Sequence, residues 1–151
     1  MEKKETPLEY SVRIKNGIAE KAKKNKGLST FLFLVVLIST VLSPALILIS
    51  DHFYLSKVLP SILTAGAALA SYWIQLRKPH ERWVIYRTAQ REIEFEIDQY
   101  QFGNGDYSDE KKDNTLANKV CKRALQLHYE WMPLVPKAEE LQNIKMNQNE
   151  L

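Results

Sequence analysis

Three histidines, one cysteine and a cluster of acidic residues are the side chains of this sequence that could carry out chemistry or bind a metal ion. His52, His80 and His128 are far apart, and none has a second ligand at a spacing typical of zinc or catalytic sites. Cys121 stands alone, so it predicts neither a disulfide nor a cysteine-based zinc site. We therefore expect no metal site at these residues.

The acidic residues lie in a turn-rich segment, GNGDYSDEKKDN, at residues 103–114. Its carboxylates could attract calcium, but their spacing does not match an EF-hand and the late bidentate glutamate is missing. The Gly103-x-Gly105 pair neither follows a strand nor opens a helix, so it does not predict a phosphate-binding loop. The sequence also offers no recognisable pairing of a nucleophile with a base. It thus predicts a solvated loop, no cofactor and no enzymatic activity.

Two long windows without charge are the strongest feature of the sequence. Residues 28–50 (LSTFLFLVVLISTVLSPALILIS) and 58–76 (VLPSILTAGAALASYWIQL) contain no Asp, Glu, Lys or Arg. A helix needs about 20 residues, at about 1.5 Å each, to cross a hydrocarbon core of roughly 30 Å. The first window is too long for a signal peptide and is not closed by a small-residue cleavage site. We therefore expect two transmembrane spans.

The short connection between the windows, residues 51–57, forces the two spans into an antiparallel hairpin. It contributes only Lys57, whereas both outer flanks are rich in Lys and Arg. Because these residues are enriched on the cytoplasmic side, we expect both termini in the cytoplasm and the protein in the inner (plasma) membrane. The flanking cations are Lys21, Lys23, Lys24 and Lys26 before the first span, and Arg77, Lys78, Arg82 and Arg87 after the second. Because the Lys and Arg residues gather beside the two spans, the net charge of +3 does not indicate a nucleic-acid partner.

The remaining sequence predicts an all-α membrane protein in four parts. These are a basic cytoplasmic juxtamembrane segment over 1–27, the transmembrane hairpin over 28–76, a cytoplasmic helical hairpin over 77–136 and a polar tail over 137–151. Within the third part, apolar residues recurring every three or four positions predict a long helix over 80–102 and an antiparallel partner over 115–131. The two faces are Ile85, Ala89, Ile93 and Ile97, and Leu116, Val120, Ala124, Leu127 and Trp131, with Asn114 as the expected N-cap of the second helix.

Three local features leave alternatives open. Residues 92–98 alternate like a strand, but no second strand is available to pair with them, which favours a helix. Pro79 could either begin a helix or kink one continuous with the second span. Within 1–27, Tyr10, Ile14, Ile18 and Ala22 form a stripe that permits an amphipathic helix, at the membrane surface or against the C-terminal part; a partly ordered segment is the other interpretation.

The order of these parts resembles a known family. After the hairpin come Arg82-Trp83, Tyr86-Arg87-x-Ala89, acidic positions near Glu92–Glu96, Tyr100, Gly105-x-Tyr107 and Trp131. This order is similar to the SLATT group of bacterial two-transmembrane domains, which accompany nucleotide second-messenger defence genes. The resemblance covers residues 28–135 and is most specific over 82–96, RWVIYRTAQREIEFE. It implies an oligomeric pore-forming effector that permeabilises the inner membrane. Because the 151 residues include no fused nucleotide-sensing domain, any trigger is expected to come from elsewhere.

Two functions follow as hypotheses. In the first, several hairpins assemble into a pore, because two helices alone enclose no lumen; the partners are then membrane lipid, further copies of the chain and permeating ions. In the second, the hairpin only anchors a module that binds a cytoplasmic protein. A coupled transporter is disfavoured because neither window contains an ionisable residue.

Candidate residues for the pore hypothesis come mainly from the second span. The small and weakly polar residues at helical spacing are the expected pore lining, namely Ser61, Thr64, Ala68, Ser71 and Gln75. The expected charges at its mouths are Lys57, Lys78 and Arg82. The expected contacts between subunits are Gly66, Ala70, Trp83, Tyr86 and Phe95. Ser39 and Ser43 of the first span are the alternative lining.

Overall fold

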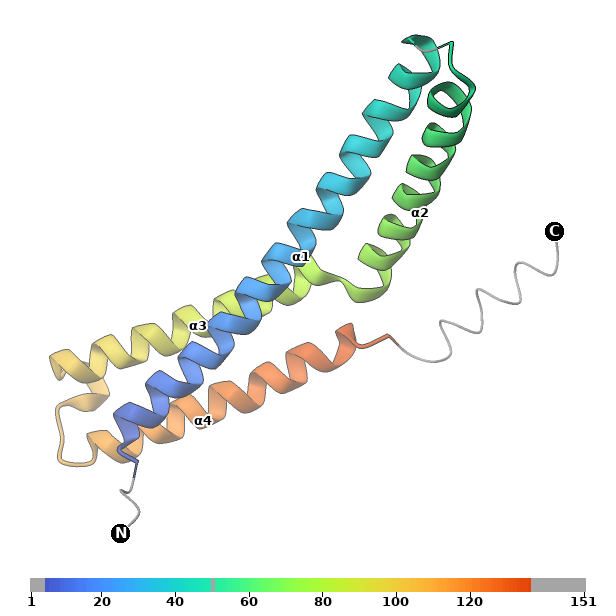
Figure 1. Cartoon of the computed structure of the whole chain (residues 1–151). Helices are drawn as coiled ribbons and strands as arrows, with labels where there is room; N and C mark the ends of the chain where they lie inside the picture. The colour runs from blue at the N-terminus through green and yellow to red at the C-terminus, as the bar shows by residue number, and fades with distance from the viewer. Residues whose placement is uncertain (1–4, 50, 137–151) are drawn as a thin grey trace. The chain divides into compact units, whose positions relative to one another are not determined.

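The computed structural model describes residues 5–49 and 51–136, and these residues form helices and short connections without a β-strand. The main helices are α1 (Pro7–Ile49), α2 (Leu59–Arg77), α3 (Pro79–Phe102) and α4 (Lys112–Trp131) (Figure 1). The expected all-α class is confirmed, and residues 92–98 are helical despite their strand-like alternation. Ser50 and the predicted tail over 137–151 lie outside the described residues.

The helix α1 is longer than the first predicted span, because it begins at Pro7 and continues without a break to Ile49. A capping box starts it: the Thr6 N–H donates to the Glu9 carboxylate at 2.9 Å, and the Glu9 N–H donates to the Thr6 hydroxyl at 3.2 Å. Pro7 occupies the first turn, where its missing N–H costs nothing. The segment over 1–27 that the sequence predicts to lie beside the membrane is therefore helical from Pro7 onward.

Residues 5–25 and 81–135 form a compact part, which we call the three-helix unit. It contains the N-terminal portion of α1 together with α3 and α4, and α3 and α4 run antiparallel as predicted (Figure 1). The stripe of α1 packs on the C-terminal part, since Ile18 is buried with residues of both other helices. The core of the unit is Ile18, Ala89, Ile93, Ile97, Tyr107, Leu116, Val120 and Leu127.

Residues 26–80 form the second part, which we call the hairpin unit. It contains the rest of α1, a π-helical turn over Tyr54–Val58 and α2. Two helices in the described part of the chain are long and apolar enough to cross a membrane, Pro7–Ile49 and Tyr54–Arg77. The π-helical turn shortens the connection that the sequence predicts over 51–57, because helical geometry resumes at Tyr54.

Two helix boundaries depend on features other than periodicity. Lys78 separates α2 from α3 with a left-handed backbone, at φ 44°, and its N–H donates to the Ile74 carbonyl at 2.9 Å. Pro79 then begins α3, which decides between the two roles that the sequence allows for this proline. The expected cap at Asn114 is wrong: α4 already begins at Lys112, so Asn114 lies within its first turn.

Candidate functional site

A shallow surface groove lies along α2 in the hairpin unit and is the candidate site for a permeation path. We call it the α2 groove, and it has a volume of about 670 Å³. Ser61, Thr64 and Ala68 line it, with Lys57 and with Ile47 of α1. Of the three stripe residues, Ser61 and Ala68 are exposed in the single chain and Thr64 is on the same surface. Small and hydroxyl side chains therefore form one continuous concave surface on an otherwise apolar hairpin.

The two other residues of the stripe continue it along α2 but do not line the groove. Gln75 is exposed and Ser71 is half-buried. The structure thus brings together three of the five predicted lining residues and leaves the remaining two on the adjoining helical turns.

The hydroxyl groups of the groove are already satisfied by the helix that carries them. The Ser61 hydroxyl donates to the Lys57 carbonyl at 2.7 Å, and the Thr64 hydroxyl donates to the Pro60 carbonyl at 2.8 Å. Such bonds to the preceding turn remove the need for an outside partner. These hydroxyls can therefore face either water or lipid, and the other observations must decide between them.

The serines of the first span occupy a different environment. Ser39 is 5% exposed and Ser43 is 8% exposed. The Ser43 hydroxyl lies 3.5 Å from the Pro60 carbonyl of α2, to which it donates. Both side chains are thus covered within the hairpin, so the structure does not favour Ser39 and Ser43 as a pore lining. Thr40 of the first span is exposed instead, and its hydroxyl donates to the Val36 carbonyl at 2.7 Å.

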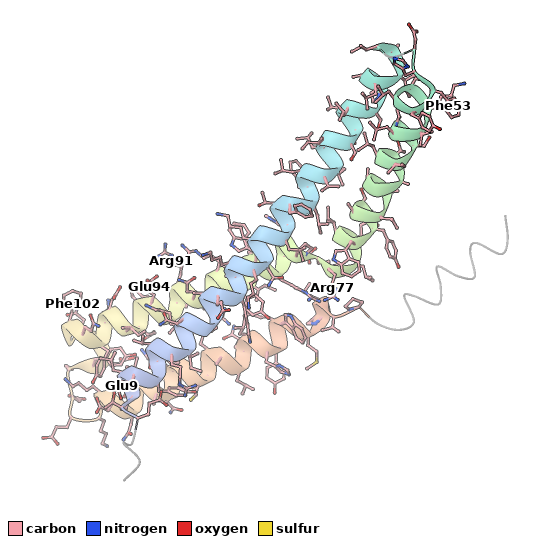
Figure 2. The ribbon with its side chains drawn as sticks, viewed as in Figure 1. Glu9, Phe53, Arg77, Arg91, Glu94 and Phe102 are labelled. Carbon is pink, nitrogen blue, oxygen red and sulfur yellow. The ribbon has the colours of Figure 1, made fainter. Side chains whose placement is uncertain are left out.

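The three predicted mouth charges differ in what holds them. Lys57 lines the groove, and its ammonium lies 5.5 Å from the centre of the Phe53 ring. Figure 2 marks Phe53 at the turn of the hairpin. Lys78 is exposed at the break between α2 and α3.

Arg82, the third predicted mouth charge, is held within the three-helix unit. One guanidinium nitrogen donates to the Leu134 carbonyl at 2.8 Å, and the group lies 5.5 Å from the centre of the Trp131 ring. Arg82 thus joins the start of α3 to the end of α4, and its role as a mouth charge stays a prediction.

The residues predicted to contact another subunit differ in how exposed they are in the single chain. Ala70 is 7% exposed and is covered within the chain, which argues against its contact with another copy. Gly66, by contrast, has open space around the position a Cβ would take. Trp83 and Tyr86 are half-buried, and Tyr86 packs against the core of the three-helix unit. Phe95 is 59% exposed on α3.

A polar network in the three-helix unit was not predicted from the sequence. The buried Tyr107 hydroxyl donates to the Glu96 carboxylate at 2.5 Å, and Lys119 donates to the same oxygen at 3.0 Å. Lys119 also pairs with Asp106 at 3.0 Å. Gly105, at φ 60°, lets the chain turn so that Tyr107 enters the core. The sequence signal that could have indicated this buried tyrosine is its position two residues after Gly105.

Burial, followed by the bond to Glu96, raises the pKa of the Tyr107 phenol well above its ordinary value. The phenol therefore stabilises the fold below its unfolded pKa of about 10, and this contribution is lost as pH rises through the folded pKa. Tyr107→Phe should lower the free energy of unfolding by about 1–2 kcal/mol at neutral pH. The variant should also lose less stability than the parent above about pH 10.

Denaturant unfolding in detergent, at neutral pH and above about pH 10, measures the free energy of unfolding of both proteins. The matched control is Tyr129→Phe, because Tyr129 is 60% exposed and its hydroxyl is not part of the network. Equal stability of the Tyr107→Phe variant and the control at neutral pH would show that the bond to Glu96 contributes nothing.

Two of the four carboxylates in the acidic segment 103–114 bond to protein groups. Asp106 pairs with Lys119, and Asp113 accepts the Tyr100 hydroxyl at 2.6 Å. Across residues 5–49 and 51–136, no three His, Cys, Asp or Glu side chains gather as a metal site would require. These two bonds hold the connection between α3 and α4 against the helices on either side of it.

Comparison with protein families gives a match over most of the chain. A family described as "Protein of unknown function (DUF4231)" matches residues 16–115, from the N-terminal portion of α1 to the start of α4. No curated protein and no solved structure matches the chain. The matched region includes the whole hairpin unit and, with it, the α2 groove.

Proposed function

The chain belongs to the DUF4231 family, and from this premise we propose that it is an integral membrane protein whose hairpins assemble into an oligomeric pore. The observation that carries the proposal is the α2 groove, where Ser61, Thr64 and Ala68 form a small, weakly polar surface on an apolar hairpin. Several copies arranged around a common axis would turn these concave surfaces inward. The result is a narrow path without charge at mid-membrane.

The arrangement of the remaining groups supports this proposal. Lys57 lies at one end of the groove and Lys78 follows the other end of α2. Positive charge at both mouths favours anions over cations in the path. Gly66 leaves open space in which the backbone of a neighbouring copy can approach closely. The large exposed residues of the hairpin, among them Phe31, Leu48 and Leu69, suit lipid contact.

The resemblance to SLATT domains supports the same function and adds a context. In that context the protein is a triggered effector in a prokaryotic inner membrane, with both termini in the cytoplasm and no enzymatic step of its own. The three-helix unit then faces the cytoplasm.

The second candidate function is a membrane-anchored interaction module without conductance. Internal bonding of the Ser61 and Thr64 hydroxyls favours it, since these groups are then compatible with lipid. In this case the hairpin is an anchor, and the three-helix unit binds a partner protein.

The mass of the detergent-solubilised protein tests the assembly on which the pore depends. We expect light scattering, corrected for detergent, to give a multiple of the 17.5 kDa chain. A Gly66→Leu variant should shift the mass toward the monomer, because it fills the space left for a neighbouring backbone. A matched change at exposed Leu69, to isoleucine, should not. A monomer mass for the parent protein would refute the oligomer and the pore together.

The topology has its own test in intact cells. A membrane-impermeant thiol reagent should label Asp51→Cys in a Cys121→Ser background, because residue 51 lies in the connection between the spans. The native Cys121 is exposed on α4 and should stay protected until the cells are opened. Labelling of both positions from outside would contradict the cytoplasmic placement of the three-helix unit.

A further inference from the structure

The outward side of α3 carries a row of large apolar side chains that the described part of the chain leaves exposed. Val84, Phe95 and Phe102 follow one another at intervals of eleven and seven residues, which places them on one stripe of the helix. The buried residues of α3, among them Ala89 and Ile93, lie on the opposite side. Two phenylalanines and a valine exposed on a single helix face are typical of a surface that contacts another protein.

Two opposite charges flank this stripe, and among the residues that the structure describes neither makes an ion pair. Arg87 is exposed and donates to Gln90 at 2.8 Å, and Asp98 is also exposed. The two charged residues are eleven positions apart, about three helical turns, so both lie along the same edge of the stripe. The face therefore has a free positive charge toward the start of α3 and a free negative charge toward its end.

The residues of this face are placed symmetrically about the level of Ile93. Val84 comes nine positions before Ile93 and Phe102 nine positions after it, while Arg91 comes two positions before and Phe95 two positions after. When a helix pairs with an antiparallel copy of itself about a two-fold axis, positions equally far from the axis face each other. The face is thus complementary to itself.

We propose that two copies of the chain pair through this face of α3, with the two helices antiparallel about a two-fold axis at the level of Ile93. Val84 then packs against the partner's Phe102. Arg87 lies opposite the partner's Asp98, since the two are six and five positions from the axis. The symmetry makes each of these contacts twice.

The free charges decide the direction of the pair. In a parallel pair, Arg87 would meet the partner's Arg87 and Asp98 would meet the partner's Asp98, so like charges would repel. The antiparallel pair brings opposite charges together instead. Arg91, marked in Figure 2, already pairs with Glu94 at 2.7 Å and adds no free charge. Its guanidinium contributes by lying over the ring of the partner's Phe95.

This pairing goes beyond the proposed pore, because it involves the three-helix unit alone. Two copies inserted in one membrane adopt it with α3 along the membrane surface, since the two-fold axis is then the membrane normal. A conducting oligomer that lacks the pairing would overturn the pairing and leave the pore. Paired copies that pass no current would overturn the pore and leave the pairing.

Disulfide formation in the detergent-solubilised, full-length protein tests the pairing. The test variant combines Val84→Cys with Phe102→Cys in a Cys121→Ser background, and each change alone is a matched control. The two positions are eighteen residues apart, about 27 Å along a helix, so they do not bridge within one chain. We expect the test variant to form disulfide-linked dimers roughly tenfold faster than either control, because pairing raises the local concentration of one thiol at the other. Equal rates for the test variant and a control, or no dimer from the test variant, would overturn the proposal.

Charge reversal in the same background separates the proposed contact from chance collision. Arg87→Glu should slow dimer formation roughly fivefold, because a carboxylate then meets the partner's Asp98 at both ends of the pair. Adding Asp98→Arg brings opposite charges together again and should restore the rate. Lys23→Glu makes the same change of charge at an exposed position of α1 and should leave the rate unchanged. A rate that Arg87→Glu does not lower, or that Asp98→Arg does not restore, would contradict the pairing.

Discussion

Replacing Ala68 by leucine should lower the conductance of the reconstituted protein by roughly half or more, because the larger side chain narrows an already narrow path. Ala68 is exposed in the single chain and lines the α2 groove, so the added atoms enter the groove and not the interior of the hairpin. Ala68→Asp should instead shift selectivity toward cations, because each subunit then contributes a carboxylate to the path. Planar-bilayer currents in asymmetric salt measure both effects.

Two controls make the Ala68 result specific. Leu69→Phe adds bulk at the next position, where the side chain is 71% exposed and does not line the groove, and it should leave the current unchanged. Thr40→Leu tests an exposed hydroxyl residue of the first span. If Thr40→Leu alters the current while both Ala68 variants conduct like the parent, the first span lines the path and the assignment to α2 is wrong.

Ile93→Ala should cause a large loss of stability in the three-helix unit. Ile93 is 1% exposed at the centre of this unit, so the truncation leaves a cavity among α1, α3 and α4. Such changes cost about 2–5 kcal/mol. Amide hydrogen exchange of the detergent-solubilised protein should show faster exchange across α3 and α4, with the hairpin unit unaffected.

Leu125→Ala is the matched control for this prediction. Leu125 lies on α4 but is 55% exposed, so its truncation should change the free energy of unfolding by no more than about 0.5 kcal/mol. If the two variants exchange alike, the core of the three-helix unit has been wrongly located.

Much of the fold could be predicted because the sequence contrasts are strong. Uncharged windows of membrane length indicated the two apolar helices, and the recurrence of Ala89, Ile93 and Ile97 indicated the buried face of α3. The continuity of α1 was harder to predict. Gly17 and Gly27 each disfavour a helix interior by about 1 kcal/mol relative to alanine, and burial of Ile18 and Ala22 offsets that cost.

The candidate site was less predictable, for a physical reason. In a helix that is apolar on all sides, periodicity does not reveal which face meets the other helix. Ser39 and Ala68 are both small residues in apolar windows, yet one is buried in the hairpin and the other lines the groove. Arg82 shows a second limit, because its bond to the Leu134 carbonyl joins positions 52 residues apart and leaves no local signal.

Conductance of the purified, full-length protein in a planar bilayer tests the proposed pore most directly. We expect discrete current steps at protein concentrations where light scattering shows the oligomer, with anions favoured over cations. A protein-free bilayer with the same detergent is the baseline. An oligomer that inserts in the expected topology and yet passes no current above that baseline would contradict the pore and leave the hairpin as an anchor.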